Sequence, residues 1–192
     1  MVAVGPGGRR PALAAHLRER LAAELEGYEA VLDLLAEARA DVRAANPLGR
    51  IPALVLDSGE TLIDSTAIVD FLDETYGGDE PLAPRSGPDR RAVLKVAALA
   101  MGACDKGLHA AYERNHHPPE KVHLPWIDDC MLQMKQALLA VEAMVDPAQP
   151  HLLLCRLTHA DIACFVAERL ARGLKIDTAA EMPKLRALAR RW

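Results

Sequence analysis

The chain has 192 residues, of which 26% are charged and 51% hydrophobic, and 27 acidic against 23 basic residues give a formal net charge of −4. This composition is typical of a globular protein and excludes a disordered or fibrous chain. The mild acidity and the few aromatic residues (two Phe, two Trp and three Tyr) argue against nucleic-acid binding, which uses a basic face or a stacking platform.

The sequence also argues against a membrane or secreted protein. Its apolar stretches fall well short of the roughly 20 residues that a membrane-spanning helix needs, and residues 1–10 lack the apolar core of a secretory signal. The four cysteines form no C-x-x-C pair and no metal-like spacing. We therefore expect a cytoplasmic protein with reduced thiols, no membrane association and no metal.

Residues 1–80 alternate between helical and strand-like patterns, which predicts an α/β domain. The expected elements are a helix over 11–27, a strand over 28–34, a helix over 36–45, a hairpin of strands over 53–56 and 61–63, and a helix that begins at Ser65. The apolar face of that last helix is Ile68, Phe71, Leu72 and Tyr76. Whether residues 1–4 add a strand stays open, because the breakers Gly5 to Gly8 follow them.

Gly and Pro crowd residues 77–88, which predicts a linker between two domains. Only helical patterns follow, so we expect an all-helical domain over 89–192. Its first helix carries a continuous apolar stripe at helical spacing: Val93, Val96, Ala97, Ala100, Cys104, Leu108 and Ala111. Further helices are predicted from Pro125 to about 145, over 158–172 and after Pro183.

The most informative segment reads N-P-L-G-R-I-P-A-L at 46–54 and, after the hairpin, D-S-T-A-I at 64–68. It resembles the glutathione transferase family, whose pattern is N-P-x-G-x-V-P-x-L, a hairpin and then E-S-x-A-I. Asp64 stands where the family usually has Glu. The resemblance implies a thioredoxin-like first domain, a helical-bundle second domain and a cis bond between Ile51 and Pro52.

The resemblance also implies that Arg50, Ile51, Asp64 and Ser65 bind glutathione. The main chain of Ile51 would pair with this short peptide as an added strand. Free N–H groups at the helix start near Ser65 attract a carboxylate, and Asp64 offers a partner for an ammonium group. A structural alternative, in which Ser65 caps the helix with the help of Asp64, is compatible with binding.

A second motif lies at Leu157-Thr158-His159-Ala160-Asp161-Ile162. Thr158 and Asp161 have the spacing of a capping box, in which each side chain accepts a hydrogen bond from the other residue's amide. The same element begins the core helix of the family's second domain. Its implied role, like that of Pro52, is structural.

The sequence departs from the family at its N-terminus. Family members place a Ser, Cys or Tyr after the first strand, whereas residues 1–27 contain no Ser, Thr, Cys or Tyr. No catalytic residue is therefore assigned. Three interpretations stay open: Arg9 and Arg10 supply a cation that lowers the thiol pKa, the protein binds glutathione without catalysis, or these residues are atypical for an unrelated reason such as a shifted reading frame.

Two functional hypotheses follow from the resemblance. The first is a glutathione S-transferase-like enzyme, a cytosolic homodimer that presents the glutathione thiolate to a small apolar electrophile held between the domains. In that case Cys104, Leu108 and Tyr112 either line the electrophile's pocket or simply pack in the core. The alternative is a non-catalytic glutathione transferase-like binding or interaction module, which the missing N-terminal hydroxyl or thiol favours.

Overall fold

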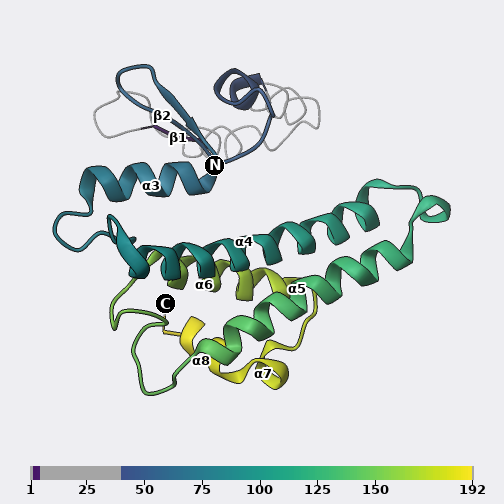
Figure 1. Cartoon of the computed structure of the whole chain (residues 1–192). Coiled ribbons are helices and arrows are strands. Elements are labelled where there is room, and N and C mark those ends of the chain that lie inside the picture. Colours follow the sequence, from purple (N-terminus) through teal and green to yellow (C-terminus); the bar gives the residue numbers. More distant parts are fainter. Residues whose placement is uncertain (1, 5–39, 192) are drawn as a thin grey trace, which may run out of the picture. The chain divides into compact units, whose positions relative to one another are not determined.

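The computed structural model describes residues 2–4 and 40–191. The chain divides into two compact units, Met1–Gly78 and Asp79–Trp192, and Figure 1 labels most of their strands and helices. The predicted helix over 11–27, the strand over 28–34 and the start of the helix over 36–45 lie outside the described residues. Residues 40–45 are helical, as predicted.

Three short strands form the sheet described in the first unit. β1 (Val2–Val4) pairs in parallel with β2 (Ala53–Val55), and β2 pairs antiparallel with β3 (Thr61–Ile63). The predicted hairpin is thus confirmed, with β2 one residue shorter than expected, and β1 answers the question left open for residues 1–4. Gly59 in the hairpin turn has φ 87°, a left-handed conformation that glycine adopts without steric cost.

The helix α3 (Ser65–Tyr76) follows β3 directly and contacts both β2 and β3. On its predicted apolar face, Ile68 and Phe71 are half-buried, but Leu72 is 41% exposed and Tyr76 64% exposed. The buried residue in this part of the helix is instead Asp73, at 6% exposure.

All of the regular secondary structure described in the second unit is helical. Its elements are α4 (Gly87–His116), the 3-10 turn η1 (Pro119–Lys121), α5 (Leu124–Met144), α6 (His159–Gly173), α7 (Thr178–Glu181) and α8 (Pro183–Ala189). The long helices α4 and α5 lie side by side, and α6 packs against both (Figure 1). The four-residue helix α7 was not predicted. In the part of the chain that the structure describes, no helix is both long and apolar enough to cross a membrane.

The apolar stripe predicted along α4 is correct as far as Cys104, which is buried. Beyond it, Leu108 is 38% exposed, whereas Gly107 and Ala110 are buried in its place. The buried face therefore continues from Cys104 through Gly107 and Ala110, in steps of three residues. A prediction that counts only apolar side chains overlooks a buried glycine.

Gly107 allows close packing inside this core. A Cβ at this position would lie 2.7 Å from Met134 Sδ on α5 and 2.7 Å from Leu174 Cδ1, which is closer than non-bonded atoms allow. Met134 is fully buried, so a shift of its side chain would disturb closely packed neighbours.

The predicted capping box begins α6. The carboxylate of Asp161 accepts hydrogen bonds from Thr158 N–H at 2.9 Å, Thr158 O–H at 2.7 Å and Leu152 N–H at 2.8 Å. Asp161 is only 3% exposed, so these three donors compensate the loss of water around its charge. The carboxylate thereby holds residue 152 to the start of α6.

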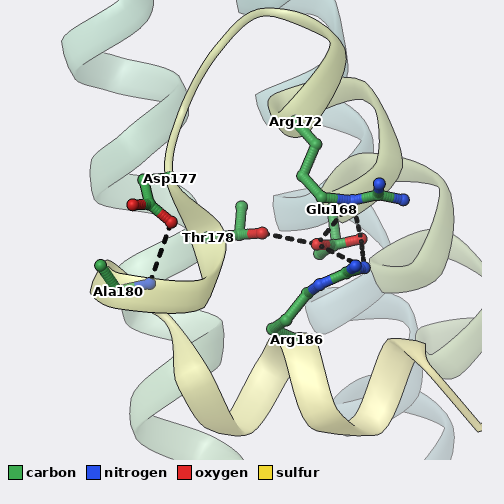
Figure 2. Close-up of polar contacts among 6 residues, drawn as sticks. All are labelled: Glu168, Arg172, Asp177, Thr178, Ala180 and Arg186. Carbon is green, nitrogen blue, oxygen red and sulfur yellow. Dashed lines mark hydrogen bonds and ion pairs between the residues drawn. The ribbon is translucent and has the colours of Figure 1, made fainter.

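Glu168 connects α6 with the two helices that follow it (Figure 2). Its carboxylate is 1% exposed and accepts from Thr178 Oγ1 at 2.6 Å. Arg172 Nε lies 3.0 Å and Arg186 Nη1 3.3 Å from the same oxygen. A buried carboxylate is tolerated when its charge and hydrogen-bonding capacity are both satisfied, as they are here.

Glu142 performs a comparable role at the start of α8. Its carboxylate oxygens accept from Lys184 N–H at 3.1 Å and Leu185 N–H at 2.6 Å. The first N–H groups of a helix lack intrahelical partners and carry partial positive charge. Glu142 on α5 therefore caps α8 from a distant point in the sequence.

We expect Gly107→Ala to lower the free energy of unfolding by about 1–3 kcal/mol relative to Gly102→Ala, because the new methyl group overlaps Met134 and Leu174. Gly102 lies on the same helix, and a methyl group added there would have nothing within 4 Å, so it shares only the change in helix propensity. Chemical denaturation followed by circular dichroism measures both. Equal stability of the two variants would contradict the close approach at Gly107.

We expect Asp161→Asn to reduce the free energy of unfolding by about 2 kcal/mol or more, because an NH₂ group would face the donors of Thr158. The matched control is Asp146→Asn, an exposed aspartate whose side-chain oxygen accepts from Ala148 N–H. That variant should change stability much less. A similar loss in both variants, measured by urea denaturation, would show that burial of the Asp161 network is unimportant.

Candidate functional site

The loop from Asn46 to Arg50 leads from the first described helix into β2. Asn46 is 2% exposed, and its N–H donates to Val42 O at 2.7 Å, which ends that helix. Its side-chain Oδ1 accepts from Leu48 N–H at 3.0 Å, and its carbonyl accepts from Gly49 N–H at 2.8 Å. These contacts form an Asx turn inside a β-turn, the geometry that Asn followed by Pro favours.

The next residues present main-chain atoms to solvent. The Ile51–Pro52 bond is cis, as the resemblance implied, and Ile51 is 61% exposed. Within the described residues, neither the N–H nor the carbonyl of Ile51 has a hydrogen-bond partner. Both groups are available to an extended peptide.

Asp64 and Ser65 form the start of α3. Asp64 is the N-cap, and its Oδ1 accepts from Thr66 N–H at 2.8 Å. The alternative in which Ser65 caps the helix is therefore wrong, because Ser65 is already its first helical residue. Among the residues the structure describes, the Ser65 hydroxyl and the second carboxylate oxygen of Asp64 have no partner.

Asp64 also has an unusual backbone, with φ 73° and ψ 139°. Positive φ is uncommon for residues other than glycine and costs free energy. The strained residue places the Asp64 side chain over the first turn of α3 and ends β3 at the same point. Such strain is concentrated at functional sites.

The strand register brings the two segments together. β2 and β3 are antiparallel with Ala53 opposite Ile63. Pro52 and Asp64 are therefore the next residues beyond the last pair, at the same end of the hairpin. Opposite residues in such a pair have Cα atoms about 5 Å apart, so the Ile51 main chain and the start of α3 lie close to each other.

The four residues predicted to contact glutathione thus converge, but in different ways. Ile51, Asp64 and Ser65 offer main-chain groups, a carboxylate and a hydroxyl at a helix N-terminus. Arg50 contributes its carbonyl to the loop, where it accepts from Asn46 Nδ2 at 2.8 Å, and its side chain is exposed. The predicted structural residues Thr158 and Asp161 belong to the second unit.

Asn46 is a site residue that the sequence analysis missed. The N-P dipeptide was used only as part of the family motif, although an Asn side chain at such a turn commonly bonds to the main chain that follows. That tendency was the available signal. The full contact with Arg50, four residues further on, depends on the path of the loop.

None of the cysteines in the second unit resembles an activated nucleophile. Burial raises the pKa of Cys104 to about 11 and that of Cys164 to about 12, and it also raises the pKa of Cys130. A raised pKa leaves less of the reactive thiolate at neutral pH. Cys155 is exposed, and its thiol donates to Gln149 Oε1 at 3.1 Å.

The second unit carries exposed apolar side chains on α4. Of the three residues proposed for an electrophile pocket, Cys104 is buried in the core, whereas Leu108 and Tyr112 are exposed. Tyr112 stacks on His116 with ring centroids 5.1 Å apart. Leu108 and Tyr112 are thus accessible from solvent, and Cys104 is a packing residue.

A cavity of about 210 Å³ lies at the start of α6, lined by Leu157, Asp161, Ile162 and Phe165. The Asp161 carboxylate already serves the capping box, so the cavity offers an apolar lining and no reactive group. Over residues 2–4 and 40–191, no three His, Cys, Asp or Glu side chains are grouped as metal ligands.

Comparison with known proteins agrees with this geometry. The family model described as glutathione S-transferase, N-terminal domain, matches residues 2–80. A structure of a glutathione transferase family member from Pseudomonas fluorescens Pf-5 with bound glutathione has a TM-score of 0.71 and 33% identity, covering 79% of this chain and 73% of that chain. A maleyl pyruvate isomerase, described as a bacterial glutathione S-transferase in Zeta class, has a TM-score of 0.62 and 25% identity, covering 79% and 72%.

The chain belongs to the glutathione transferase family. Its fold class is the predicted one, a thioredoxin-like domain followed by a helical domain. Among curated proteins, the maleylacetoacetate isomerase of Pseudomonas aeruginosa is 38% identical over 107 residues, which are 53% of this chain and 48% of that protein. The chain spans about half the length of the curated relatives it matches.

We expect iodoacetamide at pH 8 to label Cys155 first, and Cys104 and Cys164 at least about 100-fold more slowly, because their raised pKa leaves them protonated. At pH 9 the two buried thiols, with pKa near 11 and 12, should still be mostly protonated and label slowly. Mass spectrometry of timed samples measures each site. Rapid native labelling of Cys104 or Cys164 would refute this ranking, and labelling in denaturant is the control.

Proposed function

We propose that this chain binds glutathione through Arg50, Ile51, Asp64 and Ser65 and acts as a glutathione transferase-type enzyme. The observation that carries the proposal is the convergence of the exposed Ile51 main chain with the Asp64–Ser65 helix start at one end of the β2–β3 hairpin. A relative with 33% identity is described with bound glutathione, which supports the same ligand here.

Each part of the proposed site matches one part of glutathione. The Ile51 N–H and carbonyl would pair with the cysteinyl main chain as an added strand. The γ-glutamyl carboxylate would lie at the N-terminus of α3, near the Ser65 hydroxyl and the unpaired N–H groups. The ammonium group on the same carbon would face the second Asp64 oxygen, which is already held in place by the cap to Thr66.

Binding of this kind would orient the thiol rather than ionise it. Fixing both ends of the tripeptide main chain removes rotational freedom and presents the sulfur in a constant direction to a small apolar electrophile, which accelerates reaction through proximity. A cation such as Arg9 or Arg10 would favour the thiolate in this proposal. Homodimer formation and a cytoplasmic location stay predictions from the family resemblance.

The second candidate is a glutathione-binding module without catalysis. The observation in its favour is the absence of Ser, Thr, Cys and Tyr from residues 1–27. The two candidates share the binding site and differ in turnover. Conjugation of glutathione to a chlorinated nitrobenzene distinguishes them, and isomerisation of maleylacetoacetate is a second assay because one relative is named for that activity. Tight binding with neither activity would favour the binding module.

We expect Ser65→Ala and Asp64→Asn each to raise the Kd for glutathione about tenfold or more, because each removes a partner of a charged ligand group. Asp64→Asn retains an oxygen for Thr66 N–H, so the helix cap persists. Isothermal titration calorimetry measures the affinities.

The matched control is Thr75→Ala, which removes an exposed hydroxyl from the other end of α3. Its Kd should equal that of the unmodified chain. Absence of glutathione binding by the unmodified chain would overturn the proposed function, and equal affinities of Ser65→Ala and Thr75→Ala would remove Ser65 from the site.

A further inference from the structure

The side-chain amide of Asn46 is the best-connected polar group in the loop that leads to Ile51. It is almost completely buried, at 2% exposure. Its Oδ1 accepts from Leu48 N–H at 3.0 Å and its Nδ2 donates to Arg50 O at 2.8 Å. One planar amide therefore fixes two separate points of the loop.

The contact with Arg50 determines the direction of the next N–H group. Arg50 O and Ile51 N–H belong to one planar peptide unit, and in a trans unit they point in opposite directions. The Arg50–Ile51 bond is trans. Because Arg50 O points toward the buried Asn46 amide, Ile51 N–H points away from it, which agrees with the 61% exposure of Ile51.

We propose that Asn46 is a positioning residue for ligand binding: its Nδ2 holds the Arg50–Ile51 peptide plane so that Ile51 N–H is preorganised to donate to the cysteinyl carbonyl of glutathione. The inference rests on the proposed function, because it assumes that glutathione pairs with the Ile51 main chain. Asn46 does not touch the ligand and acts through the peptide unit.

Only a side chain with a donor and an acceptor at fixed spacing can make both contacts. Aspartate has the same shape and keeps the acceptor for Leu48 N–H, but it would place a second oxygen against Arg50 O. Preorganised groups bind more tightly because less freedom is lost on binding. Asn46→Asp thus removes the hydrogen bond that holds the Arg50–Ile51 peptide plane, and it keeps the acceptor that the Asx turn needs.

The test combines affinity with a residue-specific signal. We expect Asn46→Asp to raise the Kd for glutathione about tenfold. In ¹⁵N-labelled protein saturated with glutathione, hydrogen exchange of the Ile51 amide should be slowed in the unmodified chain and markedly less slowed in Asn46→Asp. A loss of global stability alone would not remove protection at this one amide.

Two controls separate this role from others. Leu48→Ala changes an exposed side chain, 71% accessible, in the same loop and should leave both readouts unchanged. Ser65→Ala should weaken binding, yet at saturating glutathione its Ile51 amide should be as protected as in the unmodified chain. Ser65→Ala affects binding of the γ-glutamyl end of glutathione, whereas Asn46→Asp affects binding of its cysteinyl main chain.

A second measurement uses the unmodified protein and so does not depend on whether a variant folds. In the unmodified protein without glutathione, the Nδ2 protons of Asn46 should already exchange slowly, whereas the Ile51 amide should become protected only when glutathione is added. Rapid exchange at Nδ2, or an unchanged Kd with normal Ile51 protection in Asn46→Asp, overturns the inference. If the unmodified chain binds no glutathione, the proposed function fails first and the positioning role fails with it.

Discussion

The antiparallel pairing of β2 with β3 is the constraint on which the candidate site depends. With Ala53 opposite Ile63, the residues just outside the pair are Pro52 and Asp64, so a loop and a helix start meet at one edge. A slip of one residue would turn the side chains of β2 to the other face. Ala53 is 1% and Leu54 7% exposed, so packing on both sides of β2 opposes such a slip and keeps the site assembled.

Carboxylates that cap helix starts in this protein differ in their burial and in the number of donors that they accept. Asp161 and Glu142 are buried and each accepts two or more donors of the chain itself. Their oxygens accept hydrogen bonds from groups of the chain itself, and these bonds hold the starts of α6 and α8 in place. Asp64 also caps a helix, but it is exposed and has a spare oxygen. The same chemical group thus stabilises folding where it is buried and is free to bind a ligand where it is not.

Features encoded by neighbouring residues were predictable from the sequence. The capping box at Thr158 and Asp161 depends on residues three apart, and the hairpin depends on a turn flanked by two apolar runs. The motif from Asn46 to Ser65 indicated the site through its resemblance to a family. The close packing of Gly107 was missed because it depends on Met134, which is distant in the sequence, and the contact of Asn46 with Arg50 was missed because it depends on the path of the loop.

The lack of an N-terminal Ser, Cys or Tyr lowers the expected catalytic rate less than the family pattern would suggest. A free thiol with a pKa of about 8.5 is about 3% ionised at pH 7, and lowering the pKa to about 6.5 would raise that fraction to about 76%, a gain of about 25-fold. With the Brønsted coefficient of about 0.45 known for thiolate attack on disulfides, the less basic thiolate is about eightfold less nucleophilic, so the net gain is about threefold. Orientation of two reactants is worth far more than this. The rate available to this chain would therefore depend chiefly on how rigidly Ile51, Asp64 and Ser65 hold the peptide, and only secondarily on a group that ionises its thiol.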